Sequence, residues 1–239
     1  MLCTAGHVVY GCSTIYMMEF IFDEPRYAAT RESRLRNLFR HLDARSLAGK
    51  RILEVGCGTG ELGQAFVEAG CQVVSLDARP EYIRELQRRF PGREAYTVDL
   101  EQWNPETLGP FDALLCFGLL YHVSTPEPLL AACARLAPEI YLETVVTDSH
   151  EPVCPLVCEE GADQAYSGQG CRPSFAWLLQ TLNRLGFSVR DISGADANWG
   201  GMCPSVFDWT PLNDGQWSRG GGLLRKMLIC SRQHTPNIA

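Results

Sequence analysis

The chain has 239 residues, of which 46% are hydrophobic and 21% are charged. These proportions are typical of a globular protein with a sizeable core, and they argue against extensive disorder. The formal net charge of −7 disfavours a nucleic acid as partner, because an acidic surface repels the phosphate backbone. No stretch is long and apolar enough to span a bilayer, so we expect a protein without membrane contacts. We expect it to be a monomer or a homodimer.

Eleven cysteines are a high count, but the number is odd and several lie in apolar runs such as residues 114–117. We interpret most of them as reduced, buried side chains of a cytoplasmic protein. A zinc site would have to use His150, Cys154, Cys158, Cys171 and Cys203. Only one closely spaced pair occurs among them, and we therefore predict no bound metal.

Hydrophobic periodicity predicts strands and helices in alternation along one domain, residues 26–239, after an N-terminal extension, residues 1–25. Helices are expected over residues 28–44, 62–69, 80–90, 126–136 and 173–185. Strands are expected over residues 51–55, 72–76, 95–98, 111–117, 139–145, 187–192 and 224–231. This alternation indicates an α/β fold with a doubly wound, mainly parallel sheet.

Two segments interrupt the alternation and predict lid insertions above a binding site, near residues 147–172 and 194–222. The first contains prolines, cysteines and glycines without a clear period. The second is rich in glycine and contains Trp199, Trp209 and Trp217, which we interpret as side chains that pack the loop.

A glycine-rich turn, with Gly56, Gly58 and Gly60, follows the first predicted strand and leads into a helix. Such a turn lets a ligand approach the backbone and the positive end of the helix. Glu54 precedes the turn, Asp77 closes the second strand and Asp99 closes the third. Three acids at successive strand ends suit an adenosine that carries a sulfonium better than one that carries a pyrophosphate. For each acid the alternative is that it caps a helix.

The segments LEVGCGTGELG, SLDARPEYI, TVDLEQW and FDALLCFGLLYHVSTPEPLL together resemble motifs of the class I S-adenosylmethionine (SAM)-dependent methyltransferases. The resemblance covers residues 26–192 and the final strand. It implies a seven-stranded sheet with an antiparallel last strand, SAM as cofactor and S-adenosylhomocysteine (SAH) as product. By this resemblance the cofactor-binding residues are Glu54, Gly56, Cys57, Gly58, Gly60, Asp77, Ala78, Asp99, Leu100 and Phe117.

The residues expected to act on an acceptor come later in the chain. His122 is the leading candidate for a general base, but it could instead hold its loop by hydrogen bonding. Glu143 is the second catalytic candidate; it could bind an amine, act as a base or face solvent. Arg172 could clamp a carboxylate or phosphate, or pair with a surface acid. Tyr121 and Gln169 complete the predicted substrate site.

We therefore expect a SAM-dependent methyltransferase that acts on an oxygen or nitrogen of a small-molecule acceptor, such as a metabolite or natural product. The alternatives are a tRNA or peptide methyltransferase, a non-catalytic SAM-binding protein, and a nicotinamide-dependent oxidoreductase on a similar fold. The last is disfavoured because the glycine spacing departs from GxGxxG.

Overall fold

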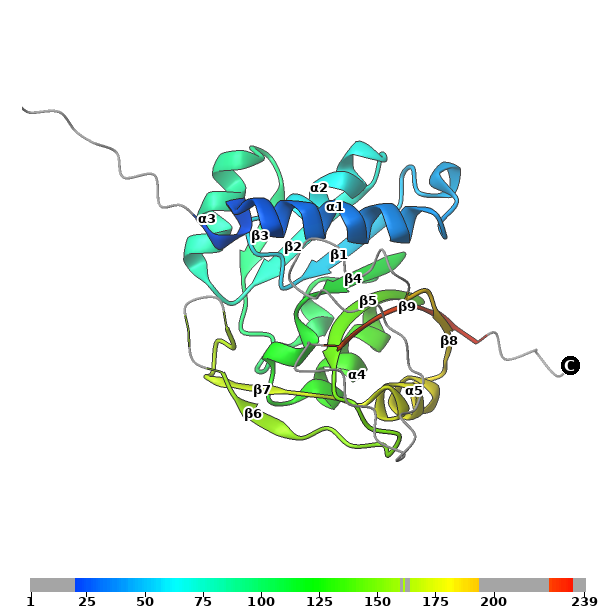
Figure 1. Cartoon of the computed structure of the whole chain (residues 1–239). Coiled ribbons are helices and arrows are strands. Elements are labelled where there is room, and N and C mark those ends of the chain that lie inside the picture. The colour runs from blue at the N-terminus through cyan, green and yellow to red at the C-terminus, as the bar shows by residue number, and fades with distance from the viewer. Residues whose placement is uncertain (1–19, 160, 162–163, 194–223, 234–239) are drawn as a thin grey trace, which may run out of the picture.

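The computed structural model describes residues 20–159, 161, 164–193 and 224–233. In this part the chain forms a seven-stranded sheet with helices on both faces (Figure 1). Its strands are β1 (Arg51–Val55), β2 (Gln72–Asp77), β3 (Glu94–Thr97), β4 (Ala113–Phe117), β5 (Glu139–Val146), β8 (Phe187–Asp191) and β9 (Leu224–Arg232). Two further strands, β6 (Leu156–Cys158) and β7 (Gln169–Cys171), pair with each other as an antiparallel hairpin.

The strand order across the sheet is β3-β2-β1-β4-β5-β9-β8. The pairs from β3 to β5 are parallel, whereas β9 runs antiparallel to both of its neighbours, β5 and β8. The predicted doubly wound, mainly parallel seven-stranded sheet with an antiparallel last strand is therefore confirmed. The carboxyl ends of β1, β2 and β4 meet at one edge of the sheet, which is where a ligand binds in folds of this kind.

The helices are α1 (Pro25–Phe39), α2 (Glu61–Glu68), α3 (Pro80–Arg89), α4 (Pro126–Leu136) and α5 (Phe175–Arg184), with 3-10 turns η1 (Ile21–Asp23), η2 (Ala44–Ser46), η3 (Pro105–Thr107) and η4 (Leu120–His122). Three helices begin with a proline, whose missing N–H would have no partner at that position in any case. The first helix differs from the predicted 28–44: it begins at Pro25 and ends at Phe39, because the chain then turns into η2.

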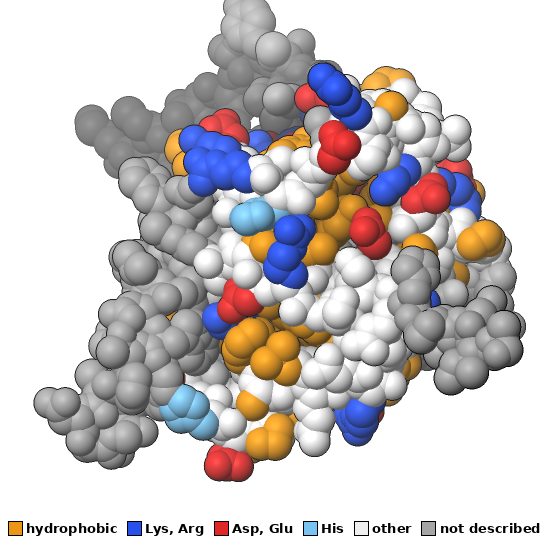
Figure 2. All heavy atoms as spheres, turned by 90° about the vertical axis from the view of Figure 1, so that its right-hand side faces the viewer, with side chains coloured by type: hydrophobic (Ala, Val, Ile, Leu, Met, Phe, Trp, Pro, Cys, Tyr) orange, Lys and Arg blue, Asp and Glu red, His pale blue; other side chains and the backbone are white. Residues whose placement is uncertain are grey.

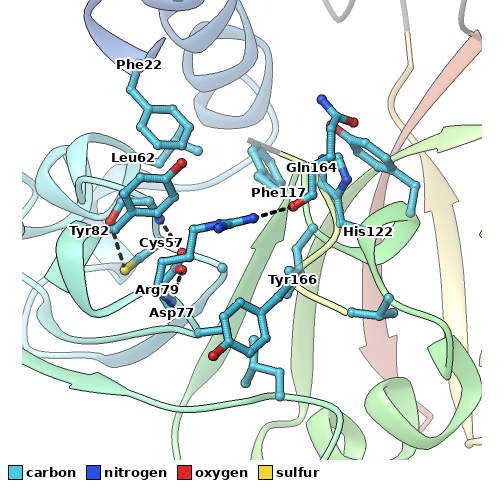
Figure 3. Close-up of a pocket in the computed structure, with 18 of the residues that line it drawn as sticks. Phe22, Cys57, Leu62, Asp77, Arg79, Tyr82, Phe117, His122, Gln164 and Tyr166 are labelled. Atoms are coloured by element: carbon cyan, nitrogen blue, oxygen red, sulfur yellow. Dashed lines mark hydrogen bonds between the residues drawn. The ribbon is translucent and has the colours of Figure 1, made fainter. Parts of the chain in front are cut away.

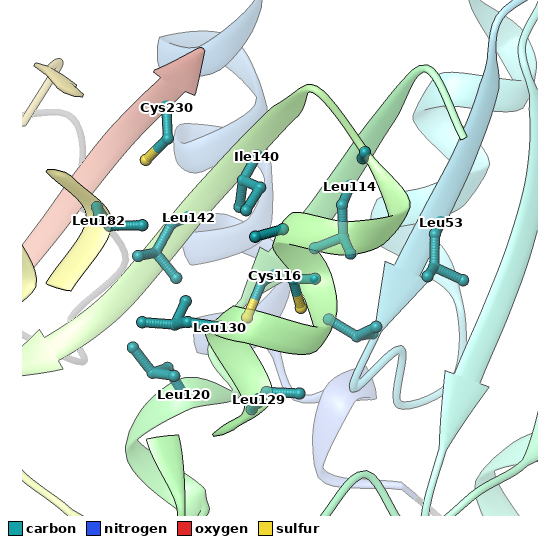
Figure 4. Close-up of a cluster of buried hydrophobic side chains, with 14 of the residues drawn as sticks. Leu53, Leu114, Cys116, Leu120, Leu129, Leu130, Ile140, Leu142, Leu182 and Cys230 are labelled. Carbon is teal, nitrogen blue, oxygen red and sulfur yellow. The ribbon is translucent and has the colours of Figure 1, made fainter. Parts of the chain in front are cut away.

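Alternate residues of the central strands point to opposite faces of the sheet and build two hydrophobic cores. Leu53 and Leu114 face α4 and α5 and belong to the core drawn in Figure 4. The neighbouring residues Ile52 and Leu115 belong to the other core, together with Phe66 of α2. Because β1 and β4 are covered on both faces, their sequences are nearly continuous apolar runs.

Two expected boundaries are changed by the structure. The predicted extension, residues 1–25, already belongs to the domain from Phe20 onward: the rings of Phe20 and Phe22 pack on Tyr82 of α3, with centroid distances of 5.9 and 5.2 Å. The first predicted lid insertion contains the β6–β7 hairpin rather than an irregular loop alone. The second, residues 194–222 with its three tryptophans, lies outside the described residues.

The surface drawn in Figure 2 is the right-hand side of the molecule in Figure 1. On this face acidic and basic side chains are interspersed, and basic side chains do not gather into a continuous patch. Among the helices of the described residues, none combines the length and the apolar character that crossing a membrane requires.

Candidate active site

A cavity of about 270 Å³ opens at the carboxyl ends of β1, β2 and β4 (Figure 3). Its walls include most of the residues that the sequence predicted, although these residues are far apart in the chain. The predicted residues that line it are Gly56, Cys57, Gly58, Asp77, Ala78, Asp99, Leu100, Phe117, Tyr121, His122 and Arg172. The parallel topology brings them together, because these strands end at the same edge of the sheet.

The turn after β1 uses glycines for two physical reasons. Gly56 and Gly58 have φ angles of +67° and +53°, which side chains rarely tolerate. A Cβ atom at Gly56 would also lie 2.8 Å from Leu119, and one at Gly58 would lie 2.8 Å from the ring of Phe22. Both glycines line the cavity, so the missing side chains leave backbone exposed to a ligand.

Asp77 ends β2 with its carboxylate at the cavity wall. One oxygen accepts a hydrogen bond from the backbone N–H of Gly58 at 2.8 Å, and the other accepts one from the N–H of Arg79 at 2.9 Å. Burial raises the pKa of Asp77 to about 6 against these two hydrogen bonds. Each oxygen keeps a lone pair that can accept a further hydrogen bond from a ligand hydroxyl.

Glu54 was expected to face the ligand, and the structure corrects this: its side chain does not line the cavity. The carboxylate is buried behind the turn, where it accepts hydrogen bonds from the N–H of Gly63 at 2.8 Å and from the hydroxyl of Ser75 at 2.7 Å. Gly63 is the third residue of α2, and Gly60 at the N-cap has no side chain to offer. Glu54 therefore caps this helix from the preceding strand, the alternative that sequence reasoning had left open.

Gly60 and Gln169 also lie outside the cavity wall. Gly60 has a φ of +88°, and a Cβ atom there would lie 2.6 Å from Leu86, so this glycine lets the turn pack on α3. Gln169 is an exposed residue at the start of β7, where it pairs with Cys158. A Cβ atom at the neighbouring Gly170 would point toward Tyr121 and Glu159, and side chains alternate along a strand, so Gln169 points to the opposite side.

Glu143 was expected to act on the acceptor, but it is fully buried beneath the cavity and does not line it. One carboxylate oxygen lies 2.8 Å from Nη1 of Arg225 and 3.4 Å from Nη2 of Arg34. Burial acts to raise the pKa of Glu143, but the two arginines outweigh it and hold the pKa below its usual value. An ionised carboxylate between two guanidinium groups is a poor base, and its evident task is to hold the two arginines at the cavity wall.

Several lining residues were missed by the sequence analysis. The helix α1 and the turn before it contribute Phe22, Tyr27, Thr30, Arg31 and Arg34, and other segments contribute Arg79, Tyr82, Glu159, Gln164, Tyr166 and Arg225. Arg225 could have been predicted from the sequence, because Arg225 and Lys226 are two adjacent charges in an otherwise largely apolar last strand. For α1 no signal existed, since its position over the glycine turn depends on the packing of Phe22 on Tyr82.

His122 and Arg172 converge on Glu159, a residue of the hairpin segment. Oε2 of Glu159 lies 2.5 Å from Nδ1 of His122, and its other oxygen accepts a hydrogen bond from Arg172. Arg172 also donates to the backbone carbonyl of Tyr121 at 3.2 Å. Arg172 is thus engaged by protein groups, as the ion-pair alternative predicted, although its partner is buried rather than at the surface.

The described cysteines fit the expectation of reduced side chains. Those described are all free, and six of them are buried: Cys57, Cys71, Cys116, Cys133, Cys171 and Cys230. Burial raises the pKa of Cys133 to about 12, which keeps the thiol protonated. Within the described ranges there is no group of three or more potential ligands that could hold a metal ion, and Cys203 lies outside those ranges.

Comparisons with known proteins agree with this architecture. Residues 53–138 match a family model described as a methyltransferase domain. A protein of Xanthomonas oryzae pv. oryzae, named ubiquinone biosynthesis O-methyltransferase, is 40% identical over 96 residues, 38% of this chain and 39% of that protein. A protein of the same name from Xanthomonas axonopodis pv. citri is 36% identical over 162 residues, 62% and 66% of the two chains. The chain thus matches about two fifths of the length of the first of these relatives.

Solved structures show the same fold. The N-terminal domain of EvdMO1, crystallised with SAH and D-fucose, aligns with a TM-score of 0.63 and 24% identity over 85% of this chain and 82% of that one. The 1,6-didemethyltoxoflavin-N1-methyltransferase of Burkholderia thailandensis aligns with a TM-score of 0.52 and 18% identity over 84% and 79%. Together, the methyltransferase domain at residues 53–138, the O-methyltransferase relatives and the shared fold support a class I SAM-dependent methyltransferase. This assignment sets aside the nicotinamide-dependent alternative.

The buried Glu54 makes stability depend on pH. Burial raises the pKa of the Glu54 carboxyl to about 7 from an ordinary 4.5, because it outweighs the hydrogen bonds from Ser75 and Gly63 that favour the ionised form. The ionised form is therefore disfavoured in the folded chain, and folding loses stability as the pH rises between these values. We expect the unfolding free energy of the wild type to fall by about 3 kcal/mol relative to Glu54→Gln between about pH 4.5 and about pH 7.5.

Urea denaturation of both proteins across this pH range measures the difference. Glu68→Gln, which removes an exposed carboxyl from α2, the helix that Glu54 caps, should follow the wild-type pH dependence. If the unfolding free energies of the wild type and Glu54→Gln change with pH in parallel, the pKa of Glu54 is not raised in the folded state and the prediction is wrong.

The ion pairs of Glu143 predict a structural defect on substitution. We expect Glu143→Gln to lower the unfolding free energy at neutral pH by about 3 kcal/mol, because Arg34 and Arg225 lose a buried countercharge. Glu127→Gln, which breaks the exposed pair with Arg184, should cost less than about 1 kcal/mol. Urea denaturation compares the two. An unchanged stability of Glu143→Gln would argue that Glu143 has no such role.

Proposed function

We propose that the protein is an enzyme that transfers a methyl group from SAM to an oxygen or nitrogen of a small-molecule acceptor. The observation that carries the proposal is one cavity whose wall contains the glycine turn, the carboxylate of Asp77 and the imidazole of His122. Figure 3 places Asp77 and His122 on opposite sides of this cavity, which suits a site where a cofactor and an acceptor meet.

The residues present fit the cofactor. Gly56 and Gly58 leave the space that a Cβ would fill, so the methionine part can approach the backbone. Asp77 has lone pairs for the ribose hydroxyls. Asp99 and Leu100 line the cavity beside it and would hold the adenine, with Ala78 and Cys57 completing the wall. When bound, SAM supplies a methyl group on a positively charged sulfur, which needs mainly alignment with a nucleophile.

The acceptor side of the cavity is formed by Phe117, Tyr121 and His122. We assign His122 as the general base, because an imidazole can take a proton from a hydroxyl or amine as it becomes methylated. The rings of Tyr121 and His122 lie 4.0 Å apart between centroids, and Nη2 of Arg225 donates to the hydroxyl of Tyr121 at 3.2 Å. Tyr121 is therefore held in place as a wall of the acceptor site.

The choice of a small acceptor is supported by the relatives, whose names specify an O-methyltransferase of ubiquinone biosynthesis. The interspersed charges of the face in Figure 2 and the net charge of −7 favour a small molecule over RNA. A peptide acceptor has no observation in its favour.

Calorimetric titration with SAH tests the cofactor site. We expect Asp77→Asn to weaken SAH binding by roughly tenfold or more, because hydrogen bonds to an ionised carboxylate are worth about 1.5–3 kcal/mol. Wild-type affinity should fall as the pH drops through about 6, where Asp77 becomes protonated. The matched variant Asp43→Asn, which changes an exposed acid that does not line this cavity, should bind as the wild type does. Equal affinity of wild type and Asp77→Asn would remove Asp77 from the site.

Formation of SAH from SAM, measured with a panel of small phenols, carboxylic acids and amines, tests methyl transfer. The proposal predicts turnover with at least one acceptor and its loss in His122→Ala with SAH affinity retained. Tight SAH binding without turnover on this panel or on bulk tRNA would favour the non-catalytic alternative. Turnover on tRNA alone would contradict the small acceptor.

A further inference from the structure

Glu159 connects the hairpin segment to the imidazole at the cavity wall. Its side chain is 4% exposed, and its two oxygens have different partners: Oε2 lies 2.5 Å from Nδ1 of His122, and Oε1 accepts from Arg172. His122 is separated from Glu159 by 37 positions in the sequence, so the contact exists only in the folded chain. The exposed fraction of the His122 side chain is 17%, and it lines the cavity.

The partners of Glu159 determine which imidazole nitrogen carries the proton. A guanidinium can only donate, so Glu159 accepts from Arg172. Burial acts to raise the pKa of Glu159, but the hydrogen bonds from His122 and Arg172 outweigh it and lower the pKa. An ionised carboxylate can only accept, and the atom that faces it must therefore be a protonated Nδ1. In a neutral imidazole the lone pair then belongs to Nε2, on the other side of the ring.

The hairpin is packed closely enough on η4 to hold this contact. A Cβ atom at Gly170 of β7 would lie 2.3 Å from the backbone oxygen of Tyr121 and 2.8 Å from Oε2 of Glu159. Next in the chain, Cys171 donates from its thiol to the carbonyl of Leu120 at 3.3 Å. The backbone N–H of Glu159 is fixed by the carbonyl of Gly168 at 3.0 Å. Glu159 thus approaches His122 from a backbone that is itself anchored on η4.

We propose that Glu159 is a positioning residue that holds His122 in the Nδ1-protonated tautomer, with the Nε2 lone pair available to an acceptor. The proposal rests on the methyl-transfer function proposed above. As the acceptor oxygen or nitrogen bonds to the methyl carbon, the carbon–sulfur bond breaks and its electron pair stays on sulfur. The acceptor proton passes to Nε2 of His122, and Glu159 stabilises the imidazolium through Nδ1–H without itself taking the proton. Arg172 keeps Glu159 ionised throughout.

Nitrogen NMR of protein labelled with ¹⁵N-histidine tests the tautomer without any acceptor. The His122 signals are assigned by their loss in His122→Ala, and spectra are recorded at about pH 8.5, above the titration range of ordinary imidazoles. We expect a protonated Nδ1 in the wild type and in the control Glu151→Ala, which removes an exposed carboxyl of the same segment. In Glu159→Ala the signals should move toward the Nε2-protonated form. A wild type protonated on Nε2, or an unchanged Nδ1 proton in Glu159→Ala, would overturn the assignment.

A double-mutant cycle tests the catalytic consequence with an acceptor that the wild type methylates. Glu159→Ala should lower kcat by on the order of tenfold to a hundredfold, within the effect of a positioned base, with the KM for SAM within about twofold. The same change in a His122→Ala background should have no further effect, because the residue acts through His122. A full additional loss there, or a change in KM alone, contradicts the proposal.

Two controls keep these outcomes interpretable. Glu159→Gln keeps the size of the side chain and a carbonyl acceptor, so it serves if Glu159→Ala does not fold; its kcat should lie between those of wild type and Glu159→Ala. The wild-type tautomer is measurable whether or not the protein binds SAH or methylates an acceptor. A failure of the proposed function therefore leaves the NMR result decisive for the Glu159–His122 contact.

Discussion

The buried carboxylate of Glu54 is the constraint on which the cavity depends. It bridges the third N–H of α2 and the hydroxyl of Ser75 on β2, and so it fixes the turn after β1 relative to both elements. Gly63 must be a glycine for this, because a Cβ there would lie 2.3 Å from Oε2 of Glu54. With the turn held from behind, its front face presents the backbone of Gly56 and Gly58 to the cavity, beside Asp77.

The cavity wall carries charges of both signs. Asp77 and Arg79 lie at the end of β2, whereas Arg34 and Arg225 are held by Glu143, a buried residue of β5. Glu143 and Glu159 have similar roles, because each is a buried carboxylate that orients a side chain of the cavity wall. Glu143 orients arginines and Glu159 orients an imidazole, so the acids nearest the acceptor act through the residues that they hold.

The strand and helix pattern could be predicted from the sequence because each buried strand is an apolar run and each helix has its own periodicity. The glycine turn, Asp77 and Asp99 were found in the same way, since strand ends of a parallel sheet converge. The errors came where one residue type serves two purposes. An acid before a glycine turn can face a ligand or cap a helix, and only the direction of the Glu54 side chain decides between them. An acid at a strand end can be a base or a countercharge, and Glu143 became a countercharge because α1 and β9 each place an arginine against it.

The sequence by itself determined the fold class, the order of the strands along the chain and the edge of the sheet where a ligand binds, because local periodicity and glycine spacing encode these features. The tertiary structure alone decided that α1 forms a wall of the cavity, that Arg172 is bound to protein groups, and that Glu159 meets His122. These contacts join segments tens of residues apart, and their geometry depends on how the hairpin packs on η4 and how Phe22 packs on Tyr82. No local pattern in the sequence records such distances.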